Sequence, residues 1–348
     1  MTTSKPDPVT SSNVVDANAT SRGKHGPWLL ADIGGSNARF GMSGGKGEQI
    51  QHISTLAVHD YAGLAEAVKA YLAKLAVSLG QDFQPPCRAA FAVATPITGD
   101  HVEMTNSPWG FSRSAVQAQL KLDSLLVLND FEALALSLPR LQASQLKAHG
   151  ALPRPHGVLA VVGPGTGLGV ASVVQTRNGW VAIPAEGGHA TLAAADDFEA
   201  ALLAYVRDRY AHVSGERLLS GIGLPLLYEA VAVVSGVANP APMSTEHIVE
   251  YGLAGSDSIC RQTLDVFCAL LGTVAGNLAL ILGARGGVYI GGGIVPRLGE
   301  YFFASRFREC FEAKGRLRSY MEQIPTAPIT DTLAALTGAA VALEQEHM

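Results

Sequence analysis

The chain's first long apolar run, WLLADIGGSNAR at residues 28–39, ends in an aspartate and passes into a glycine-rich loop. A second run of this kind, VLAVV at 158–162, leads into GPGTGLG at 163–169. Both runs are typical of buried strands, and loops this rich in glycine offer backbone N–H groups that suit an anionic phosphate. Between them, Asn129-Asp130 follows a third apolar run. We interpret the pattern as a nucleotide held from two sides, with Asp130 as a base beside its terminal phosphate.

Composition limits the possible classes of protein. The chain has 348 residues, 48% hydrophobic and 16% charged, which is long enough for a large core and predicts two domains. Its formal net charge is −5 and it has no block of Lys or Arg, so nothing favours nucleic acid or a membrane as a partner. The four cysteines have no metal-type spacing, and we interpret them as reduced core thiols of a cytoplasmic protein.

Two segments raise the question of targeting or membrane roles. Residues 1–26 are rich in Ser, Thr, Asn and Asp without an apolar stretch, so we expect a disordered leader, and their few basic residues make a poor transit peptide. Residues 260–282 are strongly apolar, but they include Arg261 and Asp265, which favours a buried core helix over a membrane span.

The order of predicted elements is an α/β alternation with a weak internal duplication. Strand, glycine turn, strand, polar turn and strand occur twice along the chain. The predicted strands are 28–33, 40–43, 50–56, 88–96, 125–128, 157–162, 168–175, 180–184 and one from Gly286 into a third glycine-rich turn. The predicted helices are 61–79, 111–120, 131–141, 196–210, 222–235, 244–253, 256–284 and 331–343, the last with Asp331 as its cap and an Ala-rich face for close packing.

These motifs also allow other interpretations. The sequence has neither GxxxxGK[ST] nor GxGxxG, the fingerprints of the commonest nucleotide-binding loops. A GxSxG at 41–45 would make Ser43 a hydrolase nucleophile, but a polar turn and a strand follow it where that motif needs a helix. Asn129 or Asp130 could cap the helix that follows, a role compatible with catalysis.

The segment EGGH at 186–189 carries two side chains that could bind a metal ion or a polar ligand. Glu186 and His189 could both reach a metal ion if the segment were helical, but the two glycines favour a turn. On a turn they suit a polyhydroxylated ligand, and His189 could instead bond locally to a carbonyl.

From about residue 27 to the C-terminus, the chain resembles bacterial glucokinases, the ATP-dependent group of the hexokinase/actin-like superfamily that lacks a zinc site. The resemblance implies a two-domain actin-like/ribonuclease H-like ATPase fold with duplicated β-hairpin phosphate loops and an interdomain cleft. It implies a small α/β domain of 27–140 plus 331–348 and a large one of 141–330. The motifs that carry it, in order, are DIGGSNAR (32–39), ITGD (97–100), MTN (104–106), LND (128–130), GPGTGLG (163–169), EGGH (186–189), HVSGERLLSG (212–221) and GGGIVPR (291–297).

The implied activity is transfer of a phosphoryl group from ATP to the 6-hydroxyl of glucose, giving glucose 6-phosphate and ADP. In such a cytoplasmic enzyme, usually a homodimer, Asp130 matches the general base and Asp32 a carboxylate that places Mg²⁺ through water. The positions that match sugar-binding residues are Asn106, Asn129, Asp130, Glu186, His189 and Glu216. Those that match nucleotide-binding residues are Asp32, Gly34, Gly35, Ser36 and Asn37 in one loop, Gly165, Thr166 and Gly167 in the other, and Gly292 and Gly293 near the adenosine.

Four positions depart from the family pattern: Ala31, Ser36, Pro164 and Ile222. Ser36 keeps the hydroxyl of the usual threonine, whereas Pro164 removes an amide donor and stiffens its loop.

Two other functions are compatible with such a fold. A non-catalytic sugar sensor would be expected to lose the base, which Asp130 provides. A sugar-independent actin-like ATPase has no use for EGGH or Glu216.

Overall fold

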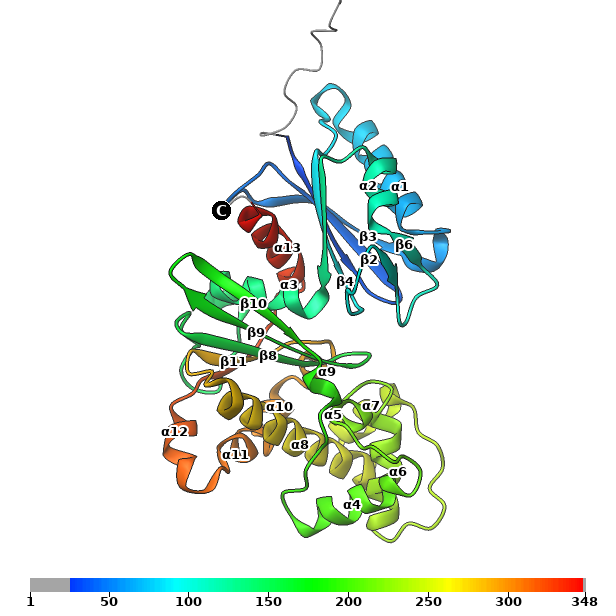
Figure 1. Cartoon of the computed structure of the whole chain (residues 1–348). Helices are drawn as coiled ribbons and strands as arrows, with labels where there is room; N and C mark the ends of the chain where they lie inside the picture. The colour runs from blue at the N-terminus through cyan, green and yellow to red at the C-terminus, as the bar shows by residue number, and fades with distance from the viewer. Residues whose placement is uncertain (1–25, 347–348) are drawn as a thin grey trace, which may run out of the picture.

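The structure, a computed structural model, describes residues 26–346, so the predicted leader lies outside the described residues except for Gly26. It contains two five-stranded sheets with helices packed around them (Figure 1). The first sheet has the order β3-β2-β1-β4-β7, formed by Trp28–Ile33 (β1), Asn37–Ser43 (β2), Ile50–Ala57 (β3), Arg88–Val93 (β4) and Ser124–Asn129 (β7). The second has the order β10-β9-β8-β11-β12, formed by Val158–Pro164 (β8), Leu168–Thr176 (β9), Gly179–Ala185 (β10), Gly287–Ile290 (β11) and Thr326–Pro328 (β12).

The two sheets repeat one topology. In the first, β1 pairs antiparallel with β2 and parallel with β4, and in the second, β8 pairs antiparallel with β9 and parallel with β11. The duplication predicted from the sequence is therefore confirmed. Because βαβ connections place helices over the parallel strands, such strands are buried on both faces, which explains why β1 and β8 are continuous apolar runs.

Helices form layers around the two sheets (Figure 1). The first core cluster packs α1 (Leu64–Leu79) and α2 (Arg113–Leu120) against one face of the first sheet. Between the sheets lie α3 (Asp130–Ser137) and α13 (Ala334–Gln345). The outer face of the second sheet is covered by α8 (Ser258–Leu282) and its neighbours. The remaining elements are β5 (His101–Glu103), β6 (Gly110–Ser112), α4 (Asp197–Arg207), α5 (Gly215–Leu218), α6 (Leu224–Val234), α7 (Thr245–Ala254), α9 (Ile294–Leu298), α10 (Glu300–Ala304), α11 (Phe307–Glu312) and α12 (Arg318–Glu322).

Two predictions are confirmed: α8 is a buried core helix, and α13 uses its small residues for close packing. By length and composition α8 could cross a membrane, but Phe267 and Leu271 are fully buried in the core of the second half. The four cysteines are free thiols. The small residues of α13 pack closely on α3 and the first sheet, and a Cβ on Gly338 would lie 1.6 Å from the carbonyl oxygen of Ala133.

Several boundaries differ from prediction. The strand predicted at 88–96 ends at Val93, and the helix predicted at 111–120 starts at Arg113 because Gly110–Ser112 pairs with His101–Glu103. The helix predicted at 131–141 ends at Ser137, followed by a 3-10 turn that contains Pro139. The prediction that Asp331 caps the last helix is wrong. That helix begins at Ala334, and the Asp331 carboxylate accepts from the Leu333 amide and from Gln145 in another segment.

Candidate active site

Each sheet carries a hairpin whose glycine-rich tip presents unpaired amides. Gly34 N bonds to Asn37 O at 2.9 Å in the β1–β2 tip, and Gly165 N bonds to Gly167 O at 2.8 Å in the β8–β9 tip. Within residues 26–346, the next two amides of each tip donate to no protein group: Gly35 and Ser36 in the first, Thr166 and Gly167 in the second. Each tip can therefore receive an anion on its main chain.

Asp130 stands at the start of α3, directly after β7. The adjacent Asn129 is the helix cap, since its Oδ1 accepts from Phe131 N at 2.9 Å and Glu132 N at 3.3 Å. The capping role considered for this pair thus falls to Asn129. Asp130 Oδ1 also accepts from Phe131 N at 2.9 Å. Parallel strands β1, β4 and β7 end at this edge of the sheet, where α/β folds bind their ligands.

The pKa of Asp130 is raised from 3.8 to about 7. Burial is the main cause, because it disfavours the charged carboxylate, and the negative charge of Asp32 at the end of β1 adds to it. The pKa of Asp32 is also raised by burial, against the opposing influence of Arg39, whose NH1 lies 3.6 Å from Asp32 Oδ2. A carboxyl that titrates near pH 7 is suited to accept a proton at neutral pH.

Phe131 connects Asp130 to the second sheet. Gly163 and Gly169 face each other across β8 and β9, and a Cβ on them would lie 2.7 and 2.0 Å from the Phe131 ring. We call Gly163, Gly169 and Phe131 the glycine notch. Because only glycine leaves room for the ring, the notch fixes the start of α3 against the second hairpin. Phe131 was not among the site residues predicted from the sequence, where the one signal was the absence of side chains on both flanks of the second tip.

The polar residues predicted to bind sugar lie in two groups. Beside the second tip, Glu216 Oε2 accepts from Leu168 N at 2.9 Å, and Glu216 Oε1 lies 3.8 Å from His189 Nε2. His189 ends a 3-10 turn, Gly187–His189, so the predicted turn is confirmed. Glu186 and His189 are exposed. Within residues 26–346, no cluster of three or more His, Cys, Asp or Glu side chains could hold a metal ion.

The other group lies beside the first tip. The carbonyl oxygen of Asn106 lies 2.4 Å from where a Cβ on Gly35 would be, so loop and tip touch. Asn129 Nδ2 donates to Thr95 O at 3.3 Å, which leaves its second amide hydrogen for a ligand.

The third glycine segment touches the second tip. A Cβ on Gly292, where φ is +76°, would lie 2.3 Å from the carbonyl oxygen of Pro164, and Gly293 follows at the start of α9. Gly221 also contacts this tip, since its N donates to Gly165 O at 2.7 Å, and the next residue, Ile222, is 71% exposed.

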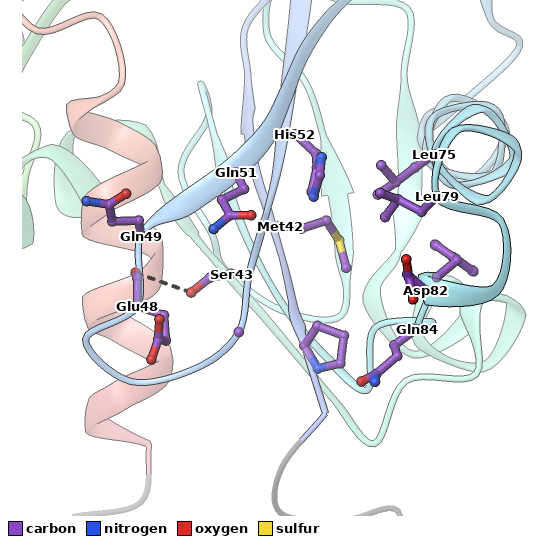
Figure 2. Close-up of a pocket in the computed structure, with 13 residues that line it drawn as sticks. Met42, Ser43, Glu48, Gln49, Gln51, His52, Leu75, Leu79, Asp82 and Gln84 are labelled. Atoms are coloured by element: carbon purple, nitrogen blue, oxygen red, sulfur yellow. Dashed lines mark hydrogen bonds between the residues drawn. The ribbon is translucent and has the colours of Figure 1, made fainter.

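A hollow of about 250 Å³ lies elsewhere, at the opposite end of β2 from the first tip (Figure 2). It is lined by Met42, Ser43, His52 and residues of α1, and includes none of the predicted sugar- or nucleotide-binding residues. Ser43 is 2% exposed, and its hydroxyl donates to the carbonyl of Glu48 at 3.4 Å. Ser43 lies at the end of a strand before a turn, so the hydrolase interpretation is excluded.

Two sheets of one duplicated topology, each with an amide-lined hairpin tip, and the carboxyl group of Asp130 at the start of α3 are typical of a phosphotransferase of the actin-like ATPase fold. The family profile for Glucokinase matches residues 29–346. The chain therefore belongs to the glucokinase family and is a glucokinase-type enzyme.

Individual relatives agree with this assignment. A glucokinase of Chromobacterium violaceum is 48% identical over 91% of this chain and 89% of its own length. The crystal structure of glucokinase from an Antarctic psychrotroph is 36% identical, covers 92% of this chain and 100% of its own, and superposes with a TM-score of 0.83. A ROK family glucokinase from Streptomyces griseus, solved with glucose and AMPPNP, shares the fold at 19% identity and a TM-score of 0.58, over 92% of this chain and 100% of its own.

Proposed function

We propose that the chain transfers the γ-phosphoryl group of ATP to the 6-hydroxyl of glucose, with Asp130 as general base. The observation that carries the proposal is the position and pKa of Asp130, a half-buried carboxyl group whose pKa is raised to about 7, at the start of α3 near the two amide-lined tips. As the 6-hydroxyl attacks phosphorus, its proton passes to Asp130, which must be ionised beforehand. Phosphoryl transfer needs little covalent chemistry from the protein, so alignment and charge stabilisation supply most of the rate.

The nucleotide is assigned to the two tips and the third glycine segment. The unpaired amides of Gly35, Ser36, Thr166 and Gly167 suit phosphate oxygens, which explains how an acidic chain without a basic cluster can bind ATP. Asn37, Gly34 and Gly165 shape the tips, and Gly292-Gly293 borders the second tip on the side assigned to the adenosine.

Mg²⁺ is assigned to Asp32, through water. The donor set fits, because Asp32 and Asp130 carry neighbouring carboxyl groups and oxygen ligands suit this cation. Bound there, the ion would neutralise charge on the phosphates. Within the described residues, no cluster of acidic or histidine ligands forms a complete protein cage, in keeping with an ion held mainly by phosphate and water.

The sugar is assigned to the polar side chains of the two groups beside the hairpin tips: Asn106, Asn129, Glu186, His189 and Glu216. Their oxygens and nitrogens can pair with the hydroxyls of one ring, and an unpaired buried polar group would cost about 1–3 kcal/mol. A sugar lacking one hydroxyl would therefore be rejected. Glu216 is positioned for this role by its bond to Leu168 N.

We further propose that residues 27–140 with 331–348 form a small domain and 141–330 a large one, which close on the sugar and exclude water from the phosphate. The clusters around each sheet support this division, although α3 packs against both sheets. We also propose a cytoplasmic homodimer that binds neither nucleic acid nor membranes.

A coupled assay of ADP production with and without glucose tests the function. Glucose-dependent turnover is expected, together with its loss in Asp130→Asn while glucose binding, measured by calorimetry, is retained. Turnover without glucose would instead identify an ATPase, and glucose binding without turnover a sensor. A near-normal rate in Asp130→Asn would overturn the assignment of the base.

A further inference from the structure

Arg39 lies on β2, directly opposite Asp32 in the antiparallel register of β1 and β2. Its guanidinium makes two contacts in different parts of the molecule. NH1 is 3.6 Å from Asp32 Oδ2, and the same nitrogen donates to the main-chain oxygen of Thr332. Arg39 and Asp32 side chains are 28% and 27% exposed, so neither is freely solvated.

Thr332 lies in the segment 329–333, by which the chain crosses from the second sheet to α13. A second crossing, 138–157, runs from α3 to the second sheet. The two crossings are joined, since Thr330 N donates to Gln145 O at 2.9 Å and the Gln145 side chain donates to the Asp331 carboxylate. Leu146 and Ile329 form a further bridge between them.

One line of contacts thus runs from the reaction site to both crossings: Asp32, Arg39, Thr332, Asp331 and Gln145. Any closing movement of one half against the other must change backbone angles in these crossings, because the chain passes between the halves there. Both contacts are made by the same NH1 nitrogen, so the position of this one atom ties the Asp32 carboxylate to Thr332.

Resting on the proposed function, we propose that Arg39 is a positioning residue that makes the placement of the Asp32 carboxylate depend on the arrangement of the two crossings. When the halves close on the sugar, the crossings move, and Arg39 brings Asp32 to its working position beside the transferred phosphate. A wrongly placed Asp32 would slow transfer without weakening sugar binding, because within residues 26–346 the Arg39 guanidinium makes no hydrogen bond or ion pair with a proposed sugar-binding residue.

The test is a double-mutant cycle with Arg39→Met and Gln145→Leu. Arg39→Met removes both contacts, and we expect kcat to fall by about tenfold or more while glucose affinity without nucleotide changes by less than about threefold. Gln145→Leu loosens the crossings far from the reaction site and should lower kcat by a smaller factor. In the double variant, Gln145→Leu should have no further effect, because its influence passes through Arg39.

If the two factors by which the single variants lower kcat multiplied in the double variant, the proposal would be overturned. Arg39 would then act on Asp32 without any influence from the crossings. So would a kcat for Arg39→Met within about threefold of the unchanged enzyme. If Arg39→Met fails to fold, Arg39→Lys takes its place in the cycle, with an intermediate loss of kcat expected. Failure of the proposed function is distinguishable, because the unchanged chain would then show no glucose-dependent turnover.

Discussion

Replacing Asp130 with asparagine should stabilise the ligand-free protein at pH 8 and leave its stability nearly unchanged at pH 4. A folded-state pKa raised from 3.8 to about 7 means that the folded protein holds this proton more tightly than the unfolded chain. The stabilising contribution of the protonated Asp130 carboxyl group is therefore fully present below pH 3.8. It is lost as the pH rises to 7, where the half-buried carboxylate must be charged. This rise in the pKa corresponds to a loss of unfolding free energy of at most about 4 kcal/mol between pH 3.8 and pH 7.

The measurement is urea unfolding, followed by tryptophan fluorescence, of both proteins between pH 4 and pH 8.5. The asparagine keeps the shape of the Asp130 side chain and its acceptor for Phe131 N, so packing is preserved. The difference in unfolding free energy should grow through this range and level off above pH 7. Asp82→Asn, at an exposed position remote from the site, is the matched control for removing one charge. A pH-independent difference, or a less stable Asp130→Asn at pH 8, would refute the reasoning.

Three further outcomes are expected. The rate at saturating substrates should fall as the pH drops below about 7, because Asp130 must be ionised to accept the proton, and a flat profile from pH 5.5 to 8 would contradict this role. Gly167→Ala should raise the KM for glucose about tenfold or more, because its Cβ would lie 2.4 Å from Glu216 Oε2 and would displace this side chain. Gly165→Ala has open space at its Cβ and should leave this KM unchanged. His149→Phe should stabilise the protein by about 1 kcal/mol and so raise its melting temperature. Among the described residues, both buried nitrogens of the His149 ring lack a protein partner, and the ring packs on three phenylalanines. An unchanged or lower melting temperature in a thermal scan would count against this.

The sequence predicted those features that depend on neighbouring residues. Both hairpins follow from apolar strands joined by glycines, and their tips lie inside the predicted loops, although the strand predicted to start at Phe40 starts at Asn37. The N-cap interpretation of Asn129 and the turn at Gly187–His189 also rest on local preferences. These preferences act over a few residues, so the amino-acid pattern alone reveals them.

Contacts between distant segments were missed or misjudged. Asp331 has the local signature of a helix cap, but Gln145, 186 residues away, binds the same carboxylate, and the helix starts later. The short strands β5, β6 and β12 were missed because pairing partners, rather than their own few residues, define them. For the same reason nothing in the motif DIGGSNAR indicated that Arg39 reaches Thr332.

The glycine notch limits how this protein can change over time. Gly163 and Gly169 belong to a hairpin that holds phosphate in the proposed mechanism. The Phe131 ring forbids a larger residue at both positions, and at Gly163 the backbone of Gly291 and Gly292 forbids it as well. A side chain added at Gly169 is tolerated only if position 131 becomes smaller, whereas one added at Gly163 also meets the Gly291–Gly292 backbone. A smaller residue at 131 alone leaves a void beside Asp130. Positions 131 and 169 should therefore vary together among functional homologues, as a linked pair spanning both halves of the chain, while position 163 should stay glycine.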